Sequence, residues 1–145
     1  TPGTVGVHEK ATHLINTFAD VNRVVALAGS KAAIGEMAVW PSTITMERLD
    51  RLRAADAVVR RLSHASGFEN DVWQFPVVLI PLGTAERPDS VVLRPIHSID
   101  GMTARSVVMP QALLDEMTDQ LLDINGVESV LYDLTHKPPG TIEWE

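Results

Sequence analysis

The sequence predicts an α+β fold, in which a small mixed or antiparallel sheet carries helices on one face. Segments with a helical apolar period alternate with short apolar segments rich in valine, isoleucine and leucine. Some of these segments are joined by tight connections, and this order favours an α+β or α/β sheet covered by helices. The chain has 145 residues with 45% hydrophobic content, which is enough for one domain with a core of its own.

The first 45 residues are expected to form an α/β extension of unknown role. A helix is predicted over residues 8–18, and a strand over residues 22–29. Residues 30–43 then form a connection of uncertain form. We place a domain boundary here and expect residues 46–145 to pack with the extension as one compact unit.

Residues 44–62 give the clearest helical pattern in the chain. Thr43 or Thr45 can cap its start, since threonine hydroxyls accept hydrogen bonds from the first free amides. The apolar stripe recurs at steps of three and four: Leu49, Leu52, Ala55, Val59 and Leu62. Two favourable i,i+4 ion pairs are expected on the polar side: Glu47–Arg51 and Asp56–Arg60.

Two strands interrupted by prolines follow. Residues 72–82 are rich in β-branched side chains, but Pro76 and Pro81 each remove a backbone donor. An edge position or a bulge is therefore predicted for this strand. Residues 83–89 form a turn, and a second strand over residues 90–97 is again interrupted by a proline.

The last third of the chain predicts an irregular segment, a helix and a final strand. Pro110 opens the helix at a position where proline is tolerated. Its inner stripe is Leu114, Met117, Leu121 and Ile124, and its outer face carries Asp115, Asp119 and Asp123. Asn125 and Gly126 stop the helix, and residues 127–135 form the strand.

Composition excludes several classes of function. The formal net charge of −7 argues against duplex nucleic acid as a partner, although a few local cations can hold a single nucleotide. The chain has no cysteine, which suits the cytoplasm and excludes thiolate metal sites and cysteine nucleophiles. No apolar segment approaches the roughly 18 residues of a membrane span, and the start lacks the layout of a signal peptide. No metal ligands are expected, because His8 and His13 do not have the i,i+4 spacing of a helical pair.

The closing segment "KPPGTIEWE", residues 137–145, combines stiffness with polar chemistry. Two successive prolines predict an extended arm, which loses little entropy when it docks. Lys137 and the hydroxyl of Thr141 can grip a phosphate, and Glu143 can accept hydrogen bonds from a sugar or base. The segment also carries two apolar anchors, Ile142 and Trp144. The alternative is a docked terminal strand whose charges face water.

"KPPGTIEWE" resembles the closing motif of the C-terminal dimerisation domain of glutamine-hydrolysing GMP synthases. Further segments resemble this domain in the same order: "RAADAVV", "WQFPVVLIPL", "LRPIHSIDGMTA" and "VESVLYDLTHKPP". The resemblance covers roughly residues 48–145, and it is specific because five motifs are collinear.

The resemblance implies a function and a set of site residues. In that family the domain pairs two subunits and helps to bind xanthosine 5′-monophosphate (XMP), which a neighbouring ATP-pyrophosphatase domain adenylates before ammonia attacks. By resemblance, Lys137 would contact the nucleotide phosphate, and Arg94 would serve the phosphate or the dimer contact. The remaining members of the implied XMP site are Thr141, Ile142, Glu143 and Gln74. The segment that holds Asp100, Met102 and Thr103 would shape the site and the interface.

The chain also departs from the family's complete enzyme. It has no Ser-Gly-Gly-Val-Asp-Ser-type loop for pyrophosphate and no cysteine for a glutaminase, so we expect no catalytic residue on it. ATP and Mg²⁺ would belong to a partner ATP-pyrophosphatase unit, and ammonia would come from a glutaminase unit. His97, Ser98 and Asp100 hold the residue types of a hydrolase triad, but sequence adjacency does not support a triad.

We therefore expect a homodimeric XMP-binding or GMP-binding module of purine biosynthesis, either a stand-alone relative or a piece of a split enzyme. The alternative is a non-catalytic assembly or regulatory module that has lost nucleotide binding. A faint similarity between residues 17–31 and 123–137 leaves open a third arrangement, a pseudo-dimeric monomer.

Overall fold

The computed structural model describes residues 5–144 and contains a four-stranded mixed sheet with two helices packed on one face. The strand order is β1-β8-β5-β3, in which β8 and β5 are parallel and the two outer pairs are antiparallel. These strands are β1 (Val25–Ser30), β3 (Val77–Ile80), β5 (Asp89–Leu93) and β8 (Val127–Asp133). The predicted α+β fold with a small mixed sheet is confirmed.

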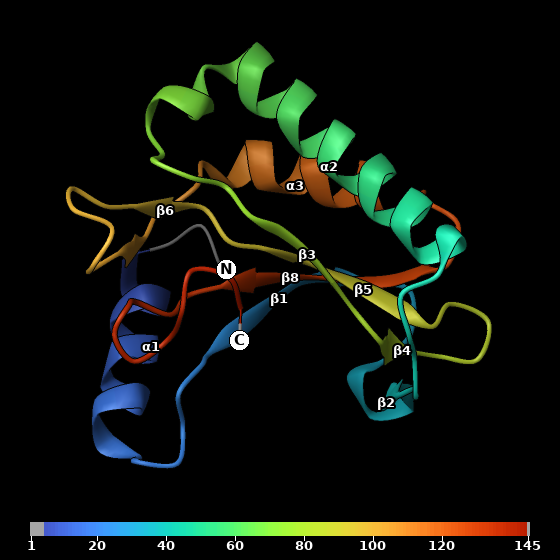
Figure 1. Cartoon of the computed structure of the whole chain (residues 1–145), viewed down its shortest axis with the longest axis horizontal. Coiled ribbons are helices and arrows are strands. Elements are labelled where there is room, and N and C mark those ends of the chain that lie inside the picture. The colour runs from blue at the N-terminus through green and yellow to red at the C-terminus, as the bar shows by residue number, and fades with distance from the viewer. Residues whose placement is uncertain (1–4, 145) are drawn as a thin grey trace.

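The helices α2 (Met46–Ser66) and α3 (Gln111–Leu122) cover the same face of this sheet (Figure 1). The core between them is built from the predicted stripes, because Ala55, Val59 and Leu62 of α2 are buried against Leu114, Met117 and Leu121 of α3 and against the strands. The inner side chains of β5 and β8 complete it: Val91, Leu93, Val130 and Tyr132.

Helix α2 begins where the threonine pattern predicted. The Thr45 hydroxyl accepts a hydrogen bond from the Arg48 amide at 3.2 Å, so Thr45 and not Thr43 is the cap. The helix ends at Gly67, which adopts φ +78°. Both predicted ion pairs of this helix are present: Glu47–Arg51 at 3.0 Å and Asp56–Arg60 at 3.2 Å.

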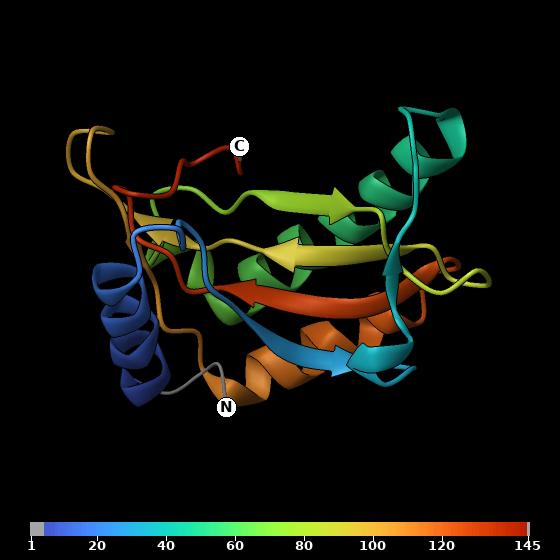
Figure 2. The same ribbon diagram turned by 90° about the horizontal axis from the view of Figure 1, so that it is seen from below.

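The third helix, α1 (Val5–Thr17), lies at one end of the sheet instead of on the helix-covered face (Figures 1 and 2). His8 meets the ring of Tyr132 edge-on at 6.0 Å between centroids. Ala11 is buried in the main core, so the N-terminal segment contributes to the same core as the rest of the chain. The predicted boundary near residue 45 stays a prediction.

Prolines end the strands where the sequence predicted interruptions. Strand β3 follows Pro76, ends before Pro81 and lies at the edge of the sheet, so the predicted edge position is confirmed. Strand β5 ends at Leu93, just before Arg94 and Pro95, and the chain continues in a separate short strand. The short strands form two pairs: β2 (Ala38–Val39) with β4 (Leu82–Gly83), and β6 (Ile96–His97) with β7 (Arg105–Ser106). The 3-10 turns are η1 (Ile34–Glu36) and η2 (Phe68–Asn70).

Two kinds of feature are absent from residues 5–144. No helix in this range is long and apolar enough to cross a membrane. The same range contains no cluster of three or more histidine and acidic side chains that could hold a metal ion.

Candidate functional site

The C-terminal tail turns back on the body at its two prolines. The Gly140 amide donates to the His136 carbonyl at 3.1 Å, and both proline peptide bonds between these residues are cis. The prediction of an extended arm was therefore wrong for residues 137–140. Proline fixes φ near a value that suits turns as well as extended chain, and here contacts with the body select the turn.

Arg94 holds the tail from inside the molecule. Its side chain is fully buried, and it donates to the carbonyls of Thr141 at 2.7 Å, Thr135 at 3.1 Å and Ile142 at 3.2 Å. Burial lowers the pKa of Arg94, and its ion pair with Asp133 at 2.9 Å opposes that shift. The guanidinium is thus directed to the chain itself, which places Arg94 to position the tail, whereas a bound ligand would have to displace these contacts.

Asp133 is the buried carboxylate on which this arrangement converges. One carboxylate oxygen accepts from Arg94, from Arg23 and, at 2.6 Å, from the indole nitrogen of Trp144. The other oxygen accepts from the Thr135 amide at 2.9 Å. The predicted anchoring role of Trp144 is confirmed, because a tryptophan near the end of the chain is tied to a charge in the sheet.

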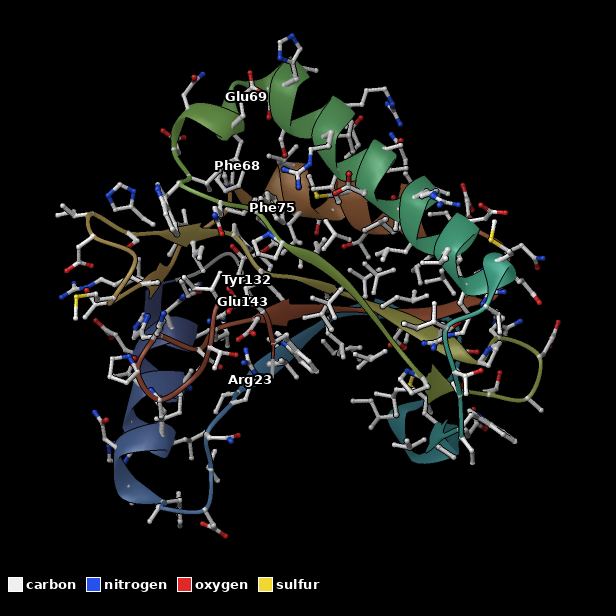
Figure 3. The ribbon with its side chains drawn as sticks, viewed as in Figure 1. Arg23, Phe68, Glu69, Phe75, Tyr132 and Glu143 are labelled. Atoms are coloured by element: carbon white, nitrogen blue, oxygen red, sulfur yellow. The ribbon has the colours of Figure 1, made fainter. Side chains whose placement is uncertain are left out.

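Arg23, from the segment before β1, contacts both the tail and Asp133. Its guanidinium lies 4.8 Å from the centre of the Trp144 ring, a cation–π arrangement. It also donates to the Thr141 carbonyl and hydroxyl at 3.4 Å each. Figure 3 shows Arg23 below the strands of the sheet. Ile142, the other predicted anchor, is buried against Ile96 and Ala104, so its anchoring role is confirmed as well.

Lys137 is fixed at the edge of the β6–β7 hairpin. Its backbone forms a two-bond antiparallel bridge with Ala104, at 2.8 and 3.0 Å. Its ammonium donates to the Gly101 carbonyl at 3.0 Å, which leaves two of its three protons for other acceptors. The side chain is half-buried and pre-positioned.

The loop that holds Lys137 is ordered by its own polar side chains. Asp100 accepts from the amides of Met102 and Thr103 at 3.0 and 3.2 Å, and these hydrogen bonds, that of Thr103 foremost, lower the pKa of Asp100. Ser98 accepts from the Gly101 amide at 2.8 Å and donates to the Thr103 carbonyl at 2.5 Å. Gly101 adopts φ +73°, a conformation that favours glycine. Ser98 and Asp100, which hold residue types of a hydrolase triad, therefore hydrogen-bond the backbone of their own loop.

A pocket of about 440 Å³ opens beside Lys137 and is called here the α1–β7 pocket. It is lined by Thr12 of α1, by Thr103, Ala104 and Arg105 of the hairpin, and by His136 and Lys137 of the tail. The imidazole of His136 accepts from the Ser106 amide at 3.1 Å. Burial, and then the nearby Arg105 and Arg94, lower the pKa of His136.

The structure brings together only part of the predicted XMP site. Lys137 lines the pocket, whereas the carbonyls of Thr141 and Ile142 face Arg94 and the Glu143 side chain is exposed. Gln74 is exposed and bridges Ile96 on the opposite edge of the β6–β7 hairpin from Lys137. Whether these residues contact a nucleotide stays a prediction.

Sequence reasoning missed the residues that complete this region: Arg23, Arg105, Asp133 and His136. The one available signal was Asp133, a carboxylate inside the otherwise apolar strand pattern "VLYDLT". A charged residue at such a position is buried only when it is paired.

The family comparison matches this C-terminal architecture directly. Residues 61–144 match the family described as the GMP synthase C terminal domain. The chain belongs to this family. The resemblance predicted from five collinear motifs is thereby confirmed.

Similar proteins carry related names. A probable glutamine-hydrolysing GMP synthase of Leptospira interrogans serovar copenhageni is 41% identical over 140 residues, covering 93% of this chain and 23% of the relative. Glutamine-hydrolysing GMP synthases of Leifsonia xyli and Streptomyces coelicolor are 42% and 40% identical over 111 residues, which is 70% of this chain in each case and 22% and 21% of the relatives. The chain therefore spans about a fifth of the length of the curated relatives it matches.

Proposed function

We propose that this chain serves GMP biosynthesis in the cytoplasm as a dimeric module that binds XMP or a similar purine nucleotide. The observation that carries the proposal is Lys137, whose ammonium is fixed by the Gly101 carbonyl beside an open pocket. An ammonium held in advance loses little entropy when it meets a phosphate, and its two remaining protons suit phosphate oxygens. Membership of the GMP synthase C-terminal family supports XMP as the ligand.

The chemistry would come from partner units. An ATP-pyrophosphatase unit would hold ATP and Mg²⁺ and adenylate the nucleotide, and a glutaminase unit would deliver ammonia. The chain itself would contribute to binding the substrate. Thr141, Ile142 and Glu143 follow Lys137 on a tail that Arg94 and Asp133 hold in one conformation, which supports their joint use at the nucleotide.

Lys137→Ala is expected to abolish nucleotide binding without unfolding the chain. Titration of the 145-residue chain with XMP should raise its thermal midpoint saturably, because a ligand that binds only the folded state stabilises it by about 2.7 kcal/mol at a hundredfold excess over Kd. The variant should melt like the wild type without ligand and should show no such rise. The ammonium makes one chain contact on a half-buried side chain, so its loss costs little stability.

Lys31→Ala is the matched control. Lys31 is an exposed lysine distant in sequence from Lys137, and no side-chain hydrogen bond or ion pair is recorded for it in residues 5–144. It should bind XMP like the wild type. An unchanged midpoint of the wild type at millimolar XMP would overturn the proposal and would favour an assembly module that has lost nucleotide binding.

The native mass in solution is expected to be that of a dimer. Strand β3 is a sheet edge with no strand on its outer side among the described residues, and unpaired edges are commonly covered. A small apolar groove of about 180 Å³ lies alongside, between Leu79 of β3 and Ile44, Leu49 and Leu52. A two-fold pairing of β3 with itself would cover both features. Light scattering at several concentrations measures the mass, and a strict monomer would contradict dimerisation and favour the pseudo-dimeric arrangement.

A further inference from the structure

Helix α1 repeats the burial pattern of helix α3 at a constant offset along the chain. Helix α1 begins at Val5 and α3 at Gln111, which is 106 positions later. At this offset the buried and half-buried positions on the inner faces coincide: Val7, His8, Ala11, Thr12 and Ile15 in α1, and Leu113, Leu114, Met117, Thr118 and Leu121 in α3. Every other position of α1 is exposed, so its inner face is the inner face of α3 in reduced form.

The strands after these helices continue the same offset. Val24 and Ala26 pack against the main core at the positions that correspond to Val130 and Tyr132, which are buried in it. The similarity between residues 17–31 and 123–137 therefore extends to a whole helix–strand unit, residues 5–31 and 111–137.

Strand β1 pairs with β8 in the way that a two-fold axis between two copies requires. An axis perpendicular to a sheet relates antiparallel neighbours, and equivalent residues lie opposite each other where the axis passes. Strands β1 and β8 are antiparallel, and Ala26 lies directly opposite its equivalent, Tyr132. Strand β1 thus takes the position that β8 of a second copy would take.

Two parts of the first unit depart from the second. Helix α1 lies at the end of the sheet, because α3 already covers the face beneath both β1 and β8 (Figures 1 and 2). After Lys31 the chain forms η1 and has no counterpart of Pro138 and Pro139. The first unit therefore keeps the strand and lacks the tail that holds the candidate site.

We infer that the β8 edge of the sheet is a surface for the β8 strand of a second copy, and that β1 fills this surface within the same chain. An open sheet edge is a template for another strand, and a copy of β8 supplies that strand without a second chain. The chain is then pseudo-dimeric at this seam, and any pairing of two chains uses a different edge. This inference does not depend on nucleotide binding.

Gly29→Val in the 145-residue chain tests the seam, because it changes β1 and leaves β8 intact. A β-carbon at Gly29 would lie 2.7 Å from the Thr118 methyl group and 3.4 Å from Leu122, so the larger valine should displace β1 from α3. The freed β8 should pair with β8 of a second chain, and light scattering should give a mass above that of the wild type at the same concentration. Gly35→Val is the matched control, because a β-carbon there meets no atom within 4 Å, and it should keep the wild-type mass.

One spin label per chain identifies the register of the new pairing. The chain has no cysteine and Asn125 is exposed, so Asn125→Cys gives a single attachment site. With Tyr132 opposite its counterpart in the second chain, the two labels should lie roughly 45–50 Å apart, at about 3.4 Å per residue of antiparallel strand. Double electron–electron resonance should detect this distance in Gly29→Val and in neither the wild type nor Gly35→Val.

A higher mass together with this distance would support the inference. A higher mass with a different distance would overturn it, because the chains would then associate through another surface. Gly29→Ala decides the case in which the valine variant does not fold, since its β-carbon meets only side chains, which can shift. Wild-type mass in the folded Gly29 variants would also overturn the inference, and XMP binding by wild type and Lys137→Ala would still test the proposed function separately.

Discussion

Asp133→Ala is expected to lower the free energy of unfolding by about 3–5 kcal/mol, because removing one partner of a buried ion pair leaves the other charge without compensation. Arg94 is fully buried, and Asp133 is its only carboxylate partner among the ion pairs of residues 5–144. The substitution also removes the acceptor for Arg23 and for the Trp144 indole. A loss of this size is a large part of the stability of a typical domain, roughly 5–15 kcal/mol.

Urea denaturation measures this loss, and acrylamide quenching of tryptophan fluorescence reports the tail separately. Quenching should rise in the variant, since Trp144 is one of three tryptophans and loses its acceptor. Asp50→Ala is the control, because Asp50 pairs with Arg53 at 2.8 Å on the exposed face of α2 and should cost no more than about 1 kcal/mol.

Asp133→Asn covers the case in which the alanine variant does not fold. It keeps acceptor oxygen for Trp144 and Arg94 but removes the charge, so it should lie between wild type and Asp133→Ala. Should Asp133→Ala unfold within about 1 kcal/mol of the Asp50→Ala control, the account of the tail as held by a buried charge network would be wrong.

The elements that sequence predicted best are those whose signal is local. The stripe of α2 has its capping threonine and its ion pairs within a few residues, so periodicity and spacing were sufficient. The edge position of β3 followed from Pro76 and Pro81 in the same way. The boundaries differed by a few residues, as at α1, which starts at Val5 instead of residue 8.

The tail and the candidate site were predicted only in part because their contacts are distant in sequence. Arg23 and Asp133 are 110 residues apart, and Lys137 and Gly101 are 36 apart. Motif resemblance identified Lys137, but no local pattern could show that Arg105 and His136 would line the same pocket. The two prolines were equally compatible with an arm and with a turn, and the hydrogen bonds of Arg94 to later carbonyls select the turn.

Gly83→Ala is the second substitution with a large expected effect, at the opposite end of the sheet. A β-carbon at Gly83 would lie 2.1 Å from the Arg87 carbonyl oxygen, which is backbone and cannot rotate away. That carbonyl accepts from the Thr84 amide at 2.9 Å and closes the turn between β4 and β5. This turn positions Thr84 and Arg87 to donate hydrogen bonds to the buried carboxylate of Glu128, at 2.8 and 2.9 Å.

Glu128 makes this clash costly. Its side chain is fully buried, and its second carboxylate oxygen has no hydrogen-bond partner among the described residues. Moving the turn withdraws the two donors that compensate the charge, so the expected loss is about 3 kcal/mol or more, overpacking and an uncompensated charge acting together. The Gly83 carbonyl also accepts a hydrogen bond from the Trp40 indole at 3.1 Å, so the substitution should weaken the β2–β4 pair as well.

Gly35→Ala is the matched control for this prediction, because a β-carbon there meets no atom within 4 Å and the residue is exposed in η1. It should change the free energy of unfolding by no more than about 1 kcal/mol, in the stabilising direction if its main effect is on the unfolded chain. Thermal and urea denaturation of both variants give the comparison. Equal stability of Gly83→Ala and Gly35→Ala would mean that the turn relaxes without disturbing Glu128, and the close approach at Gly83 would then have no structural consequence.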